Sequence, residues 1–210
     1  SDNDIEVLKK SITKLENGQK NIEAYHIYGE INKSISYETI NKAQLYVKSL
    51  KYIDKKSRLE KIKKLEEISF DKNENQLKVA VYYFFLAKQF SFISDYDKAL
   101  VFYEKALKIR LKINGKNHSQ VNRIINAIGA TKSYKGEFIN ALKDYKKVLK
   151  SKIKTIKKND SSFSITYNNI GTVYNGIKEY DNAVIYYVKA LDIDLKNYGK
   201  NHPDVATRYN

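Results

Sequence analysis

Residues 165–205 read ITYNNIGTVYNGIKEYDNAVIYYVKALDIDLKNYGKNHPDV, and related stretches occur 42 and 84 residues earlier in the chain. At this spacing small residues coincide at 87, 129 and 171 and again at 99, 141 and 183. Tyrosine coincides at 103, 145 and 187, and leucine at 107, 149 and 191. Three copies that follow one another without an insertion predict an array of repeated structural units.

Each copy predicts two antiparallel helices. Apolar residues recur with the helical period on both sides of a short turn, which reads ISDY, KGEF or IKEY. The helical hairpins are predicted near 77–116, 119–158 and 162–199, with Ser119, Ser161 and Pro203 at cap or first-turn positions. The small residues are expected where two helices cross closely, and the recurrent aromatic residues are expected to fill the space between neighbouring hairpins.

The composition of the 210-residue chain is that of an all-helical protein. One proline and eight glycines leave few breaks, and a hydrophobic content of 42% suffices for a continuous core. No apolar run reaches the roughly 18 residues that a membrane span needs, so none is predicted. The formal charge of +15 comes from lysine, since only four of the 39 basic residues are arginine. Because nucleic-acid readers rely on arginine, no specific nucleic-acid partner is predicted.

The tetrapeptide GKNH occurs at 115–118 and again at 199–202, two periods apart, with KKND between them. His118 and His202 raise the question of a metal site, but neither they nor His26 have the i, i+4 spacing of a helical metal pair. The motif is therefore interpreted as a loop between units, with both histidines exposed and with no metal or cofactor. No catalytic residues are predicted, because GATKS at Gly129 lacks the order of a phosphate loop and no GxSxG or GxGxxG is present.

The most regular segments are YNNIGTVY, EYDNAVIYYVKALDI and YGKNHPDVA in the last copy and DYDKALVFYEKALKI and NGKNH in the first. They resemble the tetratricopeptide repeat (TPR), in the 42-residue variant found in kinesin light chains and many bacterial proteins. The resemblance covers about 77–210. It implies an all-α, right-handed superhelical solenoid of antiparallel helical hairpins. Val148 departs from the pattern, because the other copies have Ala106 and Ala190.

The resemblance also divides the chain. Residues 1–76 are interpreted as diverged helical hairpins continuous with the stack, since NKAQLYVKSLKYI loosely echoes DKALVFYEKALKI. Residues 77–210 are predicted to form three 42-residue units plus the first part of a fourth. Because a solenoid needs a polar terminal cap, further repeats or an effector domain are expected C-terminal to Asn210.

In this family the first helices of the hairpins line a concave groove that holds a peptide. Residue by residue, the family's groove positions fall on Val81, Phe84, Lys88 and Ser91, then Arg123, Asn126, Ala130 and Ser133, then Ile165, Asn168, Thr172 and Asn175, with Asn169 and Asn210 in addition. Asparagine amides can both donate to and accept from a peptide backbone, and two cations would favour acidic residues. The predicted peptide-binding residues are Phe84, Lys88, Arg123, Asn126, Asn168, Asn169, Thr172 and Asn175.

Two other features have alternative interpretations. The 18 tyrosines could stack single-stranded nucleic acid, but those that recur with the repeat period are predicted to lie in the core. The segment KKVLKSKIKTIKK, residues 146–158, combines seven lysines with a stripe of apolar residues. We interpret it as a solvated outer helix face, the alternative being a contact with an acidic partner or an anionic lipid.

The function that follows from the resemblance is a protein–protein interaction scaffold that binds a peptide or partner protein, with a preference for acidic segments. The alternative is a regulatory region of a larger bacterial signalling protein, a kinase or transcription regulator, whose effector domain lies outside this chain. An enzyme is not predicted, because no catalytic constellation is found. SDNDIEVLKK has neither the n-region nor the h-region of a signal peptide. Because the chain starts with Ser and not with Met, a signal peptide or an upstream domain could have been removed, so the location stays open, with the cytoplasm favoured.

Overall fold

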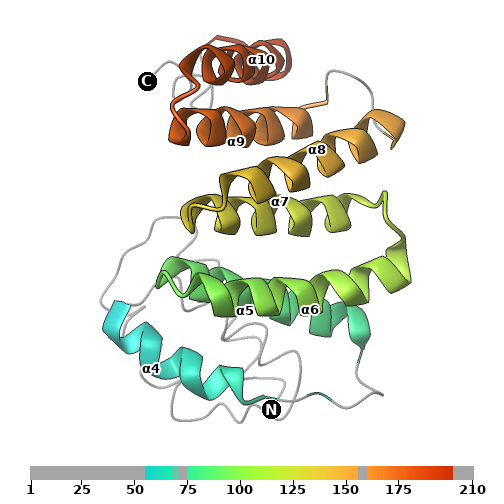
Figure 1. The fold of residues 1–210 in the computed structure, drawn as a ribbon. Coiled ribbons are helices and arrows are strands. Elements are labelled where there is room, and N and C mark those ends of the chain that lie inside the picture. Colours follow the sequence, from blue (N-terminus) through green and yellow to red (C-terminus); the bar gives the residue numbers. More distant parts are fainter. Residues whose placement is uncertain (1–54, 69, 71–74, 156–159, 201–210) are drawn as a thin grey trace. The chain divides into compact units, whose positions relative to one another are not determined.

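The computed structural model describes residues 55–68, 70, 75–155 and 160–200 (Figure 1). These residues contain seven helices and no strand, which confirms the all-α prediction for this part of the chain. The chain divides into two compact units, residues 1–109 and 110–210, and each is described by itself.

Unit 1 contains α4 (Lys55–Glu66), α5 (Gln76–Phe92) and all but the final turn of α6 (Tyr96–Asn114). The helices α5 and α6 form a hairpin, in which the rings of Phe90 and Phe102 stack with their centroids 5.4 Å apart. The helix α4 is tied to this hairpin by the Tyr82 hydroxyl, which donates to the Leu65 carbonyl at 2.7 Å. Both Tyr82 and Leu65 are fully buried, so this hydrogen bond belongs to the core of the unit.

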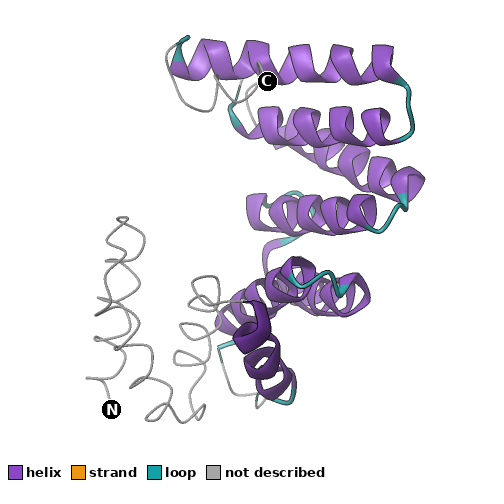
Figure 2. Cartoon of the chain, turned by 90° about the vertical axis from the view of Figure 1, so that its left-hand side faces the viewer, coloured by secondary structure: helices purple, strands orange, loops and turns teal. Residues whose placement is uncertain are grey.

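Unit 2 contains α7 (Ser119–Tyr134), α8 (Phe138–Thr155), α9 (Ser162–Gly176) and α10 (Tyr180–Tyr198). Two antiparallel hairpins, α7 with α8 and α9 with α10, are joined because α8 packs on α9 (Figures 1 and 2). The core at this junction consists of Leu142 and Tyr145 from α8 and of Ile170 and Val173 from α9. The hairpins predicted from the 42-residue period are therefore present, with bounds within a few residues of those expected.

The recurrent small residues allow two helices to cross closely, as predicted. A Cβ atom added to Gly129 would lie 2.8 Å from a ring carbon of Tyr145, and one added to Gly171 would lie 2.7 Å from the ring of Tyr187. Each glycine thus faces the recurrent tyrosine of its own hairpin. The sequence did not single out Gly176, where an added Cβ would lie 2.7 Å from the Phe138 ring.

The turn within each hairpin has one residue in the left-handed region. These residues are Ser94, Gly136 and Lys178, with φ of 68°, 85° and 65°, and they stand one period apart. Each is followed by a residue whose N–H bonds the carbonyl five residues earlier, as Glu179 bonds Tyr174 at 2.9 Å. This is the Schellman arrangement that ends a helix, and it prefers glycine at the left-handed position. Only the second copy has glycine there.

The loops that follow α6 and α10 explain the repeated GKNH. Gly115 and Gly199 both have φ of 77° and end α6 and α10. At the other end of the first loop, His118 caps α7, because its Nδ1 accepts from the Gln120 N–H at 3.1 Å. Asp160 takes the equivalent place before α9 and accepts from the Ser162 N–H at 2.9 Å. Each capping side chain thus belongs to the residue directly before a predicted cap: His118 before Ser119, and Asp160 before Ser161.

Several predictions lie outside the described residues. They concern the hairpins before residue 55, the helix that would start at Pro203, and the side chains of His26, His202 and Asn210.

Candidate peptide-binding face

The predicted groove residues of unit 2 lie on α7 and α9, the first helices of its two hairpins. We define the first-helix face as Arg123 on α7 together with Asn168, Asn169, Thr172 and Asn175 on α9. Arg123, Thr172 and Asn175 are exposed, whereas Asn168 and Asn169 are half-buried. The spacing of 168, 172 and 175 follows one side of a helix, so these side chains share a face.

One hydrogen bond within α9 and one from α10 hold part of this face in place. The Thr172 hydroxyl donates to the Asn168 carbonyl at 3.1 Å, and the Tyr187 hydroxyl reaches the Thr172 oxygen at 3.4 Å. Tyr187 was predicted to be a core residue, and its ring does pack on Gly171. Its hydroxyl nevertheless borders the first-helix face, which the repeat pattern did not indicate.

Asn126 has a different place from the other asparagines. Its side-chain amide donates to the hydroxyl of Thr166 at 3.2 Å, and Thr166 is fully buried. This hydrogen bond joins α7 to α9, so the amide of Asn126 serves the packing of the two hairpins. Asn126 is half-buried, and its amide is part of the contact between the two hairpins.

The remaining two predicted residues, Phe84 and Lys88, lie on α5 in unit 1. Phe84 is 9% exposed, and its ring contacts those of Phe85 and Tyr103, each with a centroid distance of 5.6 Å. It belongs to the core of unit 1, where burial of its ring stabilises the fold. Little of its surface is left for a ligand. Lys88 is exposed.

Lys152 corrects the interpretation of the lysine-rich segment as uniformly solvated. It is only 5% exposed, and its ammonium group donates to the Ser162 carbonyl and, at 3.1 Å, to the Thr166 hydroxyl. The same nitrogen lies 5.7 Å from the centroid of the Phe163 ring. Burial lowers the pKa of Lys152 to about 8, and the carboxylate of Asp160 opposes this shift. Lys152 therefore fastens α8 to α9.

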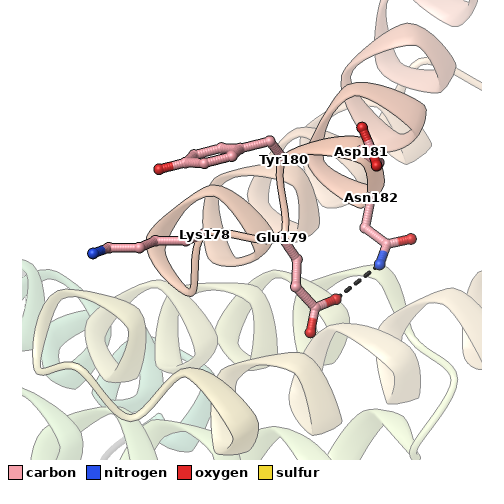
Figure 3. Close-up of a pocket in the computed structure, with 5 residues that line it drawn as sticks. All are labelled: Lys178, Glu179, Tyr180, Asp181 and Asn182. Atoms are coloured by element: carbon pink, nitrogen blue, oxygen red, sulfur yellow. Dashed lines mark hydrogen bonds between the residues drawn. The ribbon is translucent and has the colours of Figure 1, made fainter.

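A shallow pocket of about 340 Å³ lies at the turn between α9 and α10 (Figure 3). It is lined by Lys178, Glu179, Tyr180, Asp181 and Asn182. The Asn182 amide donates to the Glu179 carboxylate at 2.8 Å, so both side chains serve the turn. The pocket is formed by five consecutive residues, from the turn after α9 to the first residues of α10.

Two further properties concern the described part of the chain alone. Within it, no three His, Asp or Glu side chains come together in a group that could hold a metal ion. None of its helices has the length and apolarity needed to cross a membrane.

Comparison with protein families identifies the repeat. Residues 94–120 and 165–197 each match the family profile of the tetratricopeptide repeat. This chain carries tetratricopeptide repeats. The second match spans nearly all of α9 and α10, the hairpin that carries Asn168, Asn169, Thr172 and Asn175.

Solved structures share the fold of this TPR chain. BtubC (BKLC) from P. vanneervenii is 19% identical, with a TM-score of 0.65 over 96% of this chain and 78% of its own. A P. anserina protein proposed to be a kinesin light chain, with nearly identical TPR-like repeats, is 14% identical, with a TM-score of 0.73 over 92% and 95%. MamA is 18% identical, with a TM-score of 0.56 over 96% and 98%. The resemblance to kinesin-light-chain-like repeats is thereby confirmed as one of fold. No curated protein matches the sequence.

Proposed function

We propose that this TPR chain is a protein-interaction module that binds an extended segment of a partner protein on the first-helix face. The observation that supports this proposal is the row of amide and hydroxyl side chains on α9, formed by Asn168, Asn169, Thr172 and Asn175. Equivalent turns of α10 present apolar side chains to solvent, such as Val184 and Val188.

Such a row suits a peptide backbone. An asparagine amide offers both a donor and an acceptor, so one side chain can pair with an N–H and a C=O of an extended chain whatever its sequence. Each hydrogen bond contributes about 1 kcal/mol, and affinity grows with the number of amides engaged. The exposed guanidinium of Arg123 adds a preference for ligands with carboxylates, since its planar fork matches their geometry.

The test starts from a displayed library of random 12-residue peptides, selected on the full chain. Peptides that bind are then titrated against Asn168→Ala/Asn175→Ala and against a matched control, Asn140→Ala/Asn182→Ala, which removes two exposed asparagines from the second helices. We expect the first variant to bind roughly tenfold or more weakly, because two hydrogen bonds of about 1 kcal/mol are lost. The control should stay within about twofold.

The acidic preference is tested separately. Arg123→Glu should lower the affinity for acidic peptides more than the affinity for neutral ones. Added salt should reduce this difference in affinity, because exposed charges are screened. A library that yields no binder, or binders that are indifferent to the Asn168/Asn175 change, would contradict the proposal.

A further inference from the structure

The outer surface of α8 has a distinct composition. We define the lysine face as Lys143, Lys146, Lys150 and Lys154 together with Ile139 and Ile153. All six side chains are exposed, the two isoleucines by 62% and 69%. Positions 139, 143, 146, 150 and 153 follow the i, i+4, i+7 spacing of one helix side, so the face is a single stripe.

The stripe carries no acidic residue. The one acid of α8, Asp144, is only 6% exposed. It is paired with Lys132 at 2.7 Å and with Lys147 at 3.1 Å, away from the stripe. The ammonium groups of the lysine face therefore stand together without a carboxylate from their own helix.

The repeat itself does not require this stripe. One period later, the positions of Lys143, Lys146 and Lys150 hold Ile185, Val188 and Asp192 on α10. One period earlier, they hold a valine, a glutamate and a lysine on α6. Because these positions are exposed on all three helices, packing does not explain why α8 alone has lysine at each of them.

The chemistry of the stripe fits a membrane surface better than a protein surface. Protein interfaces are depleted in lysine and enriched in arginine, which pairs with carboxylates through a planar fork. Clustered lysines are attracted to anionic lipids, by about 1 kcal/mol for each lysine near the surface. Exposed isoleucines at both ends of the stripe can enter the boundary between headgroups and acyl chains, while lysine stems lie along it.

We propose that the lysine face docks this protein reversibly on membranes that contain anionic lipids. The four ammonium groups pair with lipid phosphate and carboxylate groups, and Ile139 and Ile153 insert at the two ends. The site lies on α8, apart from the first-helix face on α7 and α9, so it does not depend on the peptide-binding proposal.

The experiment is co-sedimentation of the full chain with vesicles of phosphatidylcholine, with or without about one third phosphatidylserine. We expect binding to the anionic vesicles alone, decreasing steeply with salt because the contact is electrostatic. Lys143→Glu/Lys146→Glu/Lys150→Glu should weaken binding at least tenfold. Ile139→Ser/Ile153→Ser should weaken it severalfold without altering the charge.

The matched control is Lys108→Glu/Lys112→Glu/Lys116→Glu, which changes the net charge equally at three other exposed lysines. It should bind vesicles within about threefold of the parent, and the melting temperature of each variant checks that it is folded. Equal loss in both triple variants would mean that net charge alone attracts the vesicles, which overturns the proposal. It is also overturned if the parent binds soluble poly-glutamate through Lys143, Lys146 and Lys150 but does not bind the vesicles.

Discussion

At the scale of single residues, Gly171 packs closely under the ring of Tyr187. An added Cβ would lie 2.7 Å from the ring and 3.2 Å from the Ala183 carbonyl, so a larger side chain forces the helices of this hairpin apart. Gly171→Leu should lower the free energy of unfolding by ~1 to 3 kcal/mol, as overpacked cores do. Urea titration measures this, with the exposed Val184→Leu as a control that should stay within ~0.5 kcal/mol. An unchanged urea midpoint for Gly171→Leu would show that the helices do not cross here.

Lys152 gives the stability a pH dependence. Its folded pKa of about 8 lies below the usual value of about 10.4 in an unfolded chain. Between these values the unfolded state holds more protons, so the Lys152 contribution to stability rises with pH, by up to about 1.4 kcal/mol per pH unit. The measurement is urea unfolding from pH 7 to pH 10. Lys152→Met should flatten the rise, whereas the exposed Lys150→Met should keep it.

The pH series ends at pH 10 because ionisation of the buried Tyr145 would affect the stability at higher pH. Burial raises the pKa of Tyr145, and the charges of Tyr134 and Asp144 raise it further. Because the folded protein holds the proton of Tyr145 more tightly than the unfolded chain does, Tyr145 lowers the stability of the fold as the pH rises. This change with pH has the opposite sign to that of Lys152. Identical slopes for the parent and Lys152→Met below pH 10 would show that Lys152 is not buried as a cation.

At the scale of elements, the hairpin turns place different residues in the same conformation. Lys178 has φ of 65° where the middle copy has Gly136. A left-handed conformation costs a residue with a Cβ roughly 1 to 2 kcal/mol relative to glycine. Lys178→Gly should therefore stabilise the fold by about 1 kcal/mol, and Gly136→Ala should destabilise it by a similar amount, as measured by thermal unfolding. A loss of stability in Lys178→Gly would contradict the assigned turn.

The caps of α7 and α9 are a second test at this scale. Asp160→Ala removes the side-chain acceptor for the Ser162 N–H and should cost about 1 kcal/mol. His118→Ala should cost about as much at the start of α7, a larger effect than expected for a solvated loop residue. Denaturant unfolding measures both losses. Variants as stable as the parent would show that the two bonds do not cap the helices.

Asp160 also has a predictable pH response. The pKa of the Asp160 carboxyl is lowered by contact with the Ser162 side chain and, as a smaller effect, with the Ser162 N–H. The stability that it contributes is present above the ordinary value of about 3.9 and is lost as the pH falls through the lower folded value. Asp160→Asn keeps an acceptor and should remove this acid-side loss.

At the scale of the whole molecule, the 42-residue period predicts most of the fold that the structure describes. It places the helices, the turns and the small residues at helix crossings, because these depend on local spacing. It did not distinguish the buried Lys152 from the exposed Lys150 and Lys154, two residues away on either side, since a long side chain can reach either solvent or the next hairpin. The equivalent residue on α10, Asp194, is also buried.

The candidate site was predicted less completely than the fold. The family positions located the polar residues of α9, but two residues at the same position of other copies differ in role. Phe84 is buried on Tyr103, and Asn126 is bonded to Thr166. Position within a repeat fixes the side of the helix, whereas the neighbouring side chains decide whether a residue stays available to a ligand.

The most direct test of peptide binding on the first helices is an NMR titration of the full chain with a peptide selected from the library. Side-chain amide resonances of Asn168 and Asn175 should shift most, together with backbone signals of α9 and of α7 near Arg123. Signals of the exposed residues on α8 and α10 should change little. If the largest shifts instead fall on α8 and α10 and the amides of Asn168 and Asn175 stay unchanged, the peptide binds elsewhere and the first-helix account is wrong.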